Sequence, residues 1–405
     1  MTKSHLLAVI VVSVLVGCGR QEQAVEATPD LQSEAERIAY SSIIIDTHID
    51  VPYRLQSKPD DVSRATESGD FDYPRAIAGG LNAPFMSIYT PAELEADGGS
   101  RALADELIDM VEGIVESAPD KFAIALSPAD VRAHFEAGLI SFPLGMENGS
   151  PVEGSFETLQ HFYDRGIRYI TLTHGLSNHI ADSSYDENRQ WNGLSEFGVE
   201  LIKEMNRIGI MVDISHVSDE AFWQAADVSE APLIASHSSA RHFTPGFERN
   251  MNDDMIVRLA ETGGVIMINY GSAFLTAAAN EYSMARRAAE KEWKADKPEL
   301  SRKEVSEQHK FIWEAEHGKL PYASLEDVLD HIDHVVELSG IEHVGIGSDY
   351  DGVGDSLPVD LKDVSSYPNL VRGLLERGYS EQDIRKILGE NLLRVWQVVA
   401  DHATR

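Results

Sequence analysis

A histidine and an aspartate two residues apart close the first apolar segment of the chain, residues 43–50, which reads Ile-Ile-Ile-Asp-Thr-His-Ile-Asp. Side chains two positions apart on a β-strand lie on the same face. The His48 imidazole and the Asp50 carboxylate would therefore leave the strand end together, at the separation of two ligands of one metal ion. The alternative is a strand end that meets solvent, because a three-residue motif of this kind is common by chance.

Two further apolar segments each end in the dipeptide Ser-His. Residues 212–216 read Val-Asp-Ile-Ser-His and residues 234–237 read Ile-Ala-Ser-His, so His216 and His237 follow neighbouring predicted strands. Imidazole is a preferred ligand of zinc and of other transition metals. Paired imidazoles at adjacent strand ends therefore predict metal binding.

A glutamate between these groups indicates a centre with two metals. Glu147 follows Pro-Leu-Gly-Met and precedes Asn-Gly, at the end of another apolar segment. A bridging carboxylate would join one metal at His48 and Asp50 to a second metal at His216 and His237. Two metals about 3.5–4 Å apart can hold a hydroxide between them. Such a centre provides a nucleophile at neutral pH without an activated Ser or Cys, which suits amide hydrolysis.

The remaining histidines are interpreted as structural. The chain has 15 histidines. His331 and His334 lie three apart on a predicted helix, but Asp330 and Asp333 flank them, which favours a solvated helix face over a metal site.

Eight strand-like segments must position the candidate ligands. They are residues 43–50, 83–89, 139–146, 169–173, 209–215, 232–236, 264–270 and 343–347, and a ninth, 122–126, is interpreted as peripheral. Near-continuous apolar strands that alternate with helical segments predict a parallel sheet covered on both faces. Polar residues follow the strand ends, where TIM-barrel active sites lie: His48, Asp50, Glu147, His174, His216, His237 and Asp349. We predict an α/β fold, a (β/α)8 TIM barrel with a binuclear metal site at the C-terminal ends of its strands. A doubly wound sheet is disfavoured, because no glycine-rich turn follows the first strand.

Helical periodicity defines the remaining organisation. Helices are predicted at 33–41, 282–295, 303–316 and 380–400. The second and third lie in a charged, alanine-rich segment at about 272–320, interpreted as an insertion on the mouth side of the barrel. The predicted division is a signal segment at 1–18, a tether and lead-in helix at 19–40, and the barrel at 41–405.

The first residues resemble a secretory signal. A basic start and an apolar stretch at 6–16 precede Leu-Val-Gly-Cys at 15–18, which is similar to a bacterial lipobox. Cys18 is the sole cysteine, so an exported chain would have no intramolecular disulfide and lipidation explains this thiol best. We expect an envelope protein anchored through an N-terminal lipid and facing the periplasm. Gly19 in place of Asp favours the outer membrane.

The net charge excludes one class of partner. The chain has 34 basic and 67 acidic residues, a formal charge of -33. Nucleic acids and anionic membrane surfaces are bound mainly through Lys and Arg, so we expect no nucleic-acid partner.

From about residue 43 to residue 399 the chain resembles the membrane (renal) dipeptidases, a family of amidohydrolase-like barrels. The resemblance rests on Asp-Thr-His-Ile-Asp at 46–50, Gly-Met-Glu-Asn-Gly at 145–149, Leu-Thr-His at 172–174, Asp-Ile-Ser-His at 213–216, Ser-His-Ser-Ser-Ala-Arg at 236–241, Arg-Asn at 249–250 and Gly-Ile-Gly-Ser-Asp-Tyr-Asp-Gly at 345–352. It implies a zinc-dependent dipeptidase that accepts a C-terminal D-residue, and some members also open β-lactams. The insertion at 272–320 departs from the mammalian members, which leaves the pocket rim and a homodimer open.

The resemblance also implies roles for single residues. One zinc would be bound by His48, Asp50 and Glu147, and the other by Glu147, His216 and His237. His174 would polarise the scissile carbonyl or the tetrahedral intermediate. Arg249 would bind the substrate's C-terminal carboxylate, and Asp349 would transfer the proton. Arg241 is the competing carboxylate ligand.

Two other functions remain as alternatives. One is a different binuclear amidohydrolase, such as a lactonase or a β-lactam or amide hydrolase; lactonase-like and phosphotriesterase-like proteins usually carry His-x-His and a bridging lysine, whereas this chain has Asp50 and Glu147. The other is a non-catalytic envelope lipoprotein that binds metal or peptide, which would have no need of Asp349 beside a complete ligand set.

Overall fold

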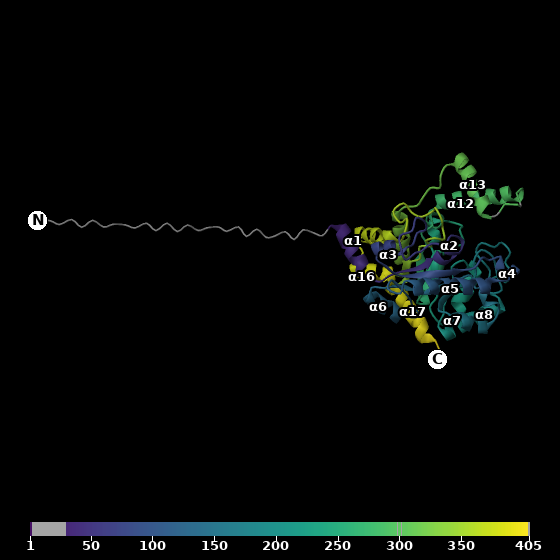
Figure 1. The fold of residues 1–405 in the computed structure, drawn as a ribbon, viewed down its shortest axis with the longest axis horizontal. Coiled ribbons are helices and arrows are strands. Elements are labelled where there is room, and N and C mark those ends of the chain that lie inside the picture. The colour runs from purple at the N-terminus through teal and green to yellow at the C-terminus, as the bar shows by residue number, and fades with distance from the viewer. Residues whose placement is uncertain (2–29, 298, 301, 404–405) are drawn as a thin grey trace.

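The structure, a computed structural model, describes residues 1, 30–297, 299–300 and 302–403 (Figure 1). The predicted signal segment and Cys18 lie outside the described residues. Among the helices of the described part, none is both long and apolar enough to cross a bilayer.

Eight parallel strands form one sheet in chain order. They are β1 (Ile44–Ile49), β2 (Leu81–Tyr89), β5 (Leu144–Glu147), β6 (Ile167–Thr171), β7 (Met211–Asp213), β8 (Ile234–Ser238), β9 (Val265–Ile268) and β10 (Val344–Ile346). Backbone hydrogen bonds join the first strand to the last: Asp349 N donates to His48 O at 3.0 Å, and Asp50 N donates to Tyr350 O at 2.9 Å. The sheet is therefore a nearly closed barrel, and the predicted TIM-barrel fold is confirmed.

One predicted strand is wrong in its extent. The segment 139–146 forms two strands, β4 (Ile140–Phe142) and β5, separated by Pro143. β4 pairs with β3 (Phe122–Ile124) in a separate two-stranded sheet, and β5 belongs to the barrel. Proline lacks the N–H that a ladder needs, so one strand ends and the other begins at this residue. The peripheral position predicted for 122–126 is confirmed.

Helices cover the outside of the barrel (Figure 1). They are α1 (Leu31–Tyr40), α2 (Val51–Ser57), α3 (Tyr73–Gly79), α4 (Leu94–Asp97), α5 (Ser100–Ser117), α6 (Pro128–Ala137), α7 (Phe156–Asp164), α8 (Glu196–Ile208), α9 (Asp219–Val228), α10 (Asp253–Glu261), α14 (Leu325–Ser339), α15 (Tyr367–Glu376), α16 (Glu381–Arg385) and α17 (Asn391–His402). Several begin at a polar residue whose side chain accepts a hydrogen bond from the first turn, as Ser195 does from Gly198 N.

The C-terminal helix covers the bottom of the barrel. Residues 386–390 form a π-helical turn between α16 and α17. Trp396 of α17 is buried and its ring centroid lies 5.4 Å from that of Phe85 on β2. Both belong to an apolar cluster with Ile45, Ile234 and Val265, which stand near the starts of their strands. The opposite end of the barrel is thereby left for the polar site.

Three helices between β9 and β10 form the predicted insertion: α11 (Ser272–Leu275), α12 (Ala277–Ala295) and α13 (Arg302–His317). α12 and α13 include the predicted helices at 282–295 and 303–316 and extend them by a few residues. Figure 1 shows both standing above the body of the barrel.

One histidine prediction is wrong. His331 is fully buried, where Ala240 N donates to its Nδ1 at 3.0 Å and its Nε2 contacts Leu275 O at 3.0 Å. It lies on the inward stripe of α14 with Val328 and Val335, and this helical position outweighs the flanking aspartates. Burial lowers the pKa of His331 to about 4.

Candidate metal centre

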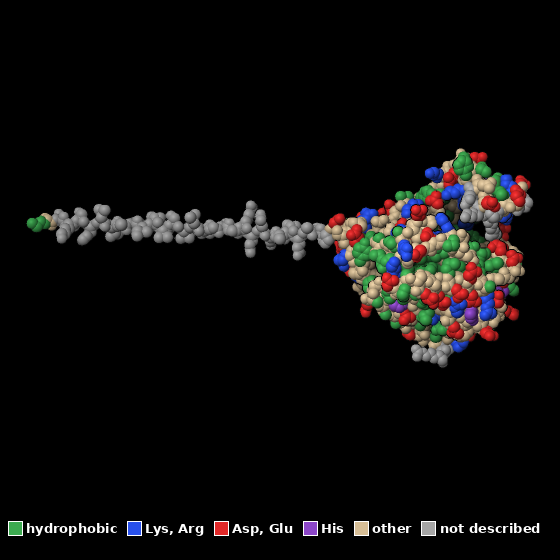
Figure 2. Space-filling model, in the orientation of Figure 1, with side chains coloured by type: hydrophobic (Ala, Val, Ile, Leu, Met, Phe, Trp, Pro, Cys, Tyr) green, Lys and Arg blue, Asp and Glu red, His purple; other side chains and the backbone are tan. Residues whose placement is uncertain are grey.

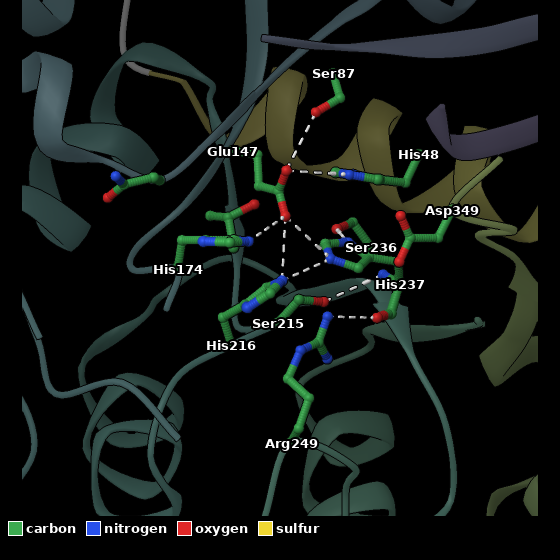
Figure 3. A network of polar contacts seen from close by, with 12 residues as sticks. His48, Ser87, Glu147, His174, Ser215, His216, Ser236, His237, Arg249 and Asp349 are labelled. Atoms are coloured by element: carbon green, nitrogen blue, oxygen red, sulfur yellow. Dashed lines mark hydrogen bonds and ion pairs between the residues drawn. The ribbon is translucent and has the colours of Figure 1, made fainter. Parts of the chain in front are cut away.

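The C-terminal strand ends bring the predicted ligands around one carboxylate (Figure 3). Glu147 Oε2 lies 3.4 Å from the Nε2 atom of His48. Glu147 Oε1 lies 3.1 Å from the Nε2 atom of His216, 3.4 Å from that of His237 and 3.5 Å from that of His174. The two carboxylate oxygens therefore face different groups of imidazoles, which is the arrangement that a bridging ligand needs.

Two aspartates also lie near His48. The Nε2 atom of His48 lies 3.5 Å from Asp50 Oδ2, and the candidate ligand atoms of His48, Asp50 and Asp349 all lie within 4.8 Å of one another. Asn269 Nδ2 donates to Asp349 Oδ2 at 2.7 Å and so fixes this carboxylate. A Cβ atom at Gly352 would lie 2.1 Å from Asp349 Oδ1 and 2.2 Å from Asp50 Oδ2. Only glycine leaves room for both aspartates here.

Two of these side chains depend on unusual backbone. His216 has φ +71° and Asp349 has φ +64°, the left-handed region that non-glycine residues rarely adopt. Each residue lies just beyond the end of a barrel strand, and each points toward the cluster in Figure 3. Such conformations persist only where the surrounding structure holds them, and they are concentrated at functional sites.

Tyr169 on β6 orients the His48 ring. Its hydroxyl donates to Thr47 O at 2.9 Å, so its oxygen is free to accept a hydrogen bond from His48 Nδ1, also at 2.9 Å. With the proton on Nδ1, the Nε2 atom faces the two carboxylates. The aromatic ring fits because residue 145 is glycine, where a Cβ would lie 2.0 Å from the ring of Tyr169. Supporting hydrogen bonds of this kind set the tautomer of metal-binding histidines.

An equivalent relay orients His237. Ser236 Oγ donates to Asp213 Oδ2 at 2.6 Å and lies 2.8 Å from His237 Nδ1. Because the hydroxyl proton is used by Asp213, the serine oxygen accepts from Nδ1–H and leaves the Nε2 lone pair toward Glu147. The sequence prediction included neither this relay nor Tyr169. The sequence gives little sign of either contact, since Tyr169 lies in a buried strand and is typical of a core residue.

The charges of the cluster are strongly perturbed. Burial lowers the pKa of both His216 and His237 well below its usual range, so both imidazoles are neutral and have lone pairs to share. Burial opposes ionisation of Glu147, but His48 and the neighbouring histidines hold its pKa well below the usual range. Burial, and then the charges of Asp50 and Glu147, raise the pKa of Asp349 well above its usual range.

The residues fit a pair of divalent cations. Two buried polar atoms on the metal side of the cluster have no hydrogen-bond partner within the described residues: His48 Nε2 and Asp50 Oδ1. Buried polar atoms without partners are costly, and a metal ion would satisfy such lone pairs. Neutral imidazoles with carboxylates are the donor set that zinc takes in hydrolytic sites.

The two arginine candidates differ in their surroundings. Arg249 is buried, donating from Nη1 to Ser238 Oγ at 2.7 Å and from Nη2 to His237 O at 2.8 Å, while its Nε has no partner in the described structure. Arg241 instead holds Asp219 through two hydrogen bonds of 2.7 and 2.5 Å. Arg249 therefore lies against the cluster and has N–H donors that are not hydrogen-bonded within the described structure, whereas the guanidinium of Arg241 is paired with Asp219.

A cavity of about 850 Å³ opens above the cluster. Asp50, Glu147, His174, His216 and Asp349 lie at its base, and aromatic residues such as Tyr89 and Tyr185 line its sides. α12 and α13 contribute to its outer wall. The volume suits a small molecule.

The family is established by comparison with known proteins. The profile of the membrane dipeptidase family, peptidase family M19, matches residues 32–405. The chain therefore belongs to this family of metallopeptidases, and the resemblance predicted from the motifs is confirmed.

Solved structures agree with this assignment. The probable dipeptidase PvdM from Pseudomonas aeruginosa is 26% identical with a TM-score of 0.80, over 92% of this chain and 99% of that one. A metallopeptidase described as dipeptidase AC is 24% identical with a TM-score of 0.72, over 88% of this chain and 98% of its own. A metallopeptidase from Rhodobacter sphaeroides, liganded with a phosphinate mimic of the dipeptide L-Ala-D-Ala, is also 24% identical with a TM-score of 0.72, over 88% and 99% of the two chains.

Proposed function

We propose that this protein hydrolyses the peptide bond of free dipeptides, including those with a C-terminal D-residue, with two zinc ions. One ion would be bound by His48, Asp50 and Glu147, and the other by Glu147, His216 and His237. The observation that carries the proposal is the central position of Glu147, whose two oxygens face separate imidazoles at 3.1–3.5 Å. The phosphinate mimic of L-Ala-D-Ala bound to the Rhodobacter sphaeroides relative supports the substrate class.

The chain's own residues divide the remaining work. When bound, the zinc ions supply Lewis acidity toward the scissile carbonyl and the attacking water. The positive charge of the bound ions would favour the ionised form of Asp349. This carboxylate then takes a proton from that water and gives it to the departing amine, since an unprotonated amine leaves poorly. Asn269 holds Oδ2 of this carboxylate and leaves Oδ1 for the transfer. His174, at the cavity wall, donates to the oxygen on which negative charge develops.

Arg249 binds the substrate's C-terminal carboxylate in this proposal. A guanidinium has five N–H donors, and the two hydrogen bonds to Ser238 and His237 leave three, including the unpartnered Nε. Phe274, whose ring lies 5.3 Å from the guanidinium carbon, shields the same group and also lines the cavity. A free dipeptide then fits between this charge and the metal pair.

A kinetic panel tests the proposal. The protein is reconstituted with zinc and assayed on L,L and L,D dipeptides, with a lactone and a β-lactam as alternative substrates. We expect dipeptide turnover that a chelator abolishes and zinc restores. Turnover of the lactone alone, or no turnover of any dipeptide by zinc-loaded protein, would refute the dipeptidase function.

We propose that the protein is anchored to the bacterial envelope through a lipid on Cys18 and faces the periplasm. The support is the lipobox-like sequence at 15–18 and the absence of any other cysteine.

A further inference from the structure

The outer wall of the cavity carries positive charge on a strongly acidic protein. Arg286 and Arg287 of α12 and Lys310 of α13 line the cavity above the candidate metal centre. The whole chain has a formal charge of -33, so three cations at one opening are unexpected. Figure 2 shows a hollow between these insertion helices and the body of the barrel.

The acidic residues of the outer cavity already have counter-charges. Asp351 Oδ2 accepts from Arg54 Nε at 3.0 Å. Lys310 Nζ lies 3.1 Å from Asp355 Oδ2 and 3.8 Å from Glu314 Oε1. The deeper acids belong to the metal cluster. The charge of Lys310 is therefore neutralised, and these carboxylates are paired with cations other than Arg286 and Arg287.

Arg286 and Arg287 form no ion pair with any carboxylate of the described residues, Glu290 one helical turn further along included. The Arg287 guanidinium carbon lies 6.0 Å from the ring of Tyr185, which also lines the cavity. Among the described cations that line the first cavity, these two guanidiniums are the ones without an ion pair.

The charged face of α12 continues beyond the first cavity. A second cavity of about 670 Å³ shares His174 and Arg287 with the first, and Lys291 and Lys294 line it together with Glu93 and Glu290. Positions 287, 291 and 294 fall on one face of a helix. Three cations and one carboxylate, Glu290, therefore share this face of α12, which leaves it with a net positive charge.

We propose that this face of α12 is an anion subsite for a second carboxylate of the substrate, so that dipeptides with an acidic first residue are preferred. The inference rests on the proposed dipeptidase function. Arg249, buried beside the metal ligands, is assigned to the C-terminal carboxylate, so the first residue's side chain extends toward the cavity mouth. Guanidinium pairs with carboxylate through parallel hydrogen bonds, which gives Arg286 and Arg287 a specific ligand class.

Isosteric substrates test the subsite. Glu-Ala and Gln-Ala differ in charge and scarcely in size, and kcat/KM is measured for both with zinc-loaded protein at low and high salt. We expect Glu-Ala to be favoured by about fivefold or more, the order of one good charge pair, with the preference falling as salt rises. The Arg286→Gln/Arg287→Gln variant should bring the ratio to about one and leave Ala-Ala turnover unchanged.

Lys297→Gln is the matched control. It removes one positive charge just beyond the C-terminal end of α12, outside both cavities, where Lys297 Nζ lies 3.9 Å from the ring centroid of Trp293. It should keep the wild-type ratio. A wild-type ratio near one, or an unchanged ratio in the double variant, overturns the subsite while Ala-Ala turnover still supports the dipeptidase. If no dipeptide is hydrolysed, the proposed function fails, and calorimetry then tests the subsite by itself. Equal Kd values for phosphinate analogues of Glu-Ala and Gln-Ala would overturn the subsite, and tighter binding of the Glu-Ala analogue would support it.

Discussion

His216 Nε2 and His237 Nε2 lie 2.8 Å apart in the buried cluster. Burial keeps both rings neutral, and Ser236 holds the proton of His237 on its other nitrogen. Two acceptor lone pairs at this distance repel each other unless a proton or a cation lies between them and Glu147. The pair therefore has the geometry of two ligands for one ion.

The first prediction is that binding of two zinc ions depends on Glu147. Glu147→Gln removes the charge and one acceptor that both metal positions would share, so we expect fewer than two zinc ions per chain and loss of dipeptide turnover. Elemental analysis after reconstitution measures the first, and an Ala-D-Ala assay the second. Glu314→Gln, on the wall of the same cavity, should keep two ions. A Glu147→Gln protein with both metals and full activity would show that the bridge is misassigned.

The proton-transfer role of Asp349 gives a second prediction. Asp349→Asn keeps a side chain that can accept from Asn269 but cannot carry a proton. We expect both metals and the fold to remain while turnover falls by about a hundredfold or more, within the range for loss of a general acid–base. Asp355→Asn, in the same cavity but hydrogen-bonded to Tyr322, should stay within about threefold of wild type.

Metal analysis separates two failures of that prediction. Normal turnover with both metals bound would refute the proton transfer. Loss of activity together with loss of metal would make Asp349 a metal ligand, which its position within 4.8 Å of the His48 and Asp50 ligand atoms would then explain.

Substrate length should depend on Arg249. Because a guanidinium recognises the free carboxylate, amidated dipeptides and tripeptides should be poor substrates. Arg249→Lys should raise KM for free dipeptides by about tenfold, because Lys cannot form two parallel hydrogen bonds. Arg241→Lys should affect stability rather than KM, since Arg241 pairs with Asp219. Equal turnover of a dipeptide and its amide would remove both arginines from recognition.

The barrel and the positions of the candidate ligands were predictable because both follow from a local pattern. A buried strand followed by a polar residue recurs at Glu147, His216 and His237, and parallel strands bring such ends together. The pattern also predicted that Glu147 bridges two groups of ligands, but it does not show distances, so which oxygen faces which imidazole came only from the structure.

The parts that could not be predicted depend on contacts between distant segments. Tyr169 reaches His48 from a strand 121 residues away and fits only because residue 145 is glycine. His331 was misjudged because its neighbours Asp330 and Asp333 point to Arg377, while the imidazole turns into the core. For His331 the sequence neighbours gave the wrong environment, and for Tyr169 they gave no sign of its polar partner.

The lipid anchor is tested by Cys18→Ser. The substitution removes the only thiol, so the protein should lose lipid labelling and move from the membrane to the soluble periplasmic fraction. Fractionation of cells labelled with a fatty-acid analogue measures both. The variant should keep dipeptidase activity, because Cys18 precedes the barrel residues in the sequence. A variant that is still labelled and membrane-bound would refute the anchor.

The last prediction concerns stability in acid. The pKa of His331 is lowered to about 4 by burial, from an ordinary value of 6.5. Between these values the unfolded chain binds a proton that the folded chain excludes, so stability is full above about pH 6.5 and falls as the pH drops toward 4. At pH 5 this single group costs about 2 kcal/mol relative to pH 7.5.

His331→Gln should remove that dependence. Glutamine offers one acceptor for Ala240 N and one donor for Leu275 O, but it does not titrate. We expect the variant to be less stable than wild type at pH 7.5, because the fit is poorer, and the difference to shrink or reverse by about 2 kcal/mol at pH 5. Urea unfolding at both pH values measures this, and taking the difference between the two proteins cancels the pH dependence of the metal centre. Parallel stability curves for the two proteins would show that protonation of His331 does not oppose folding.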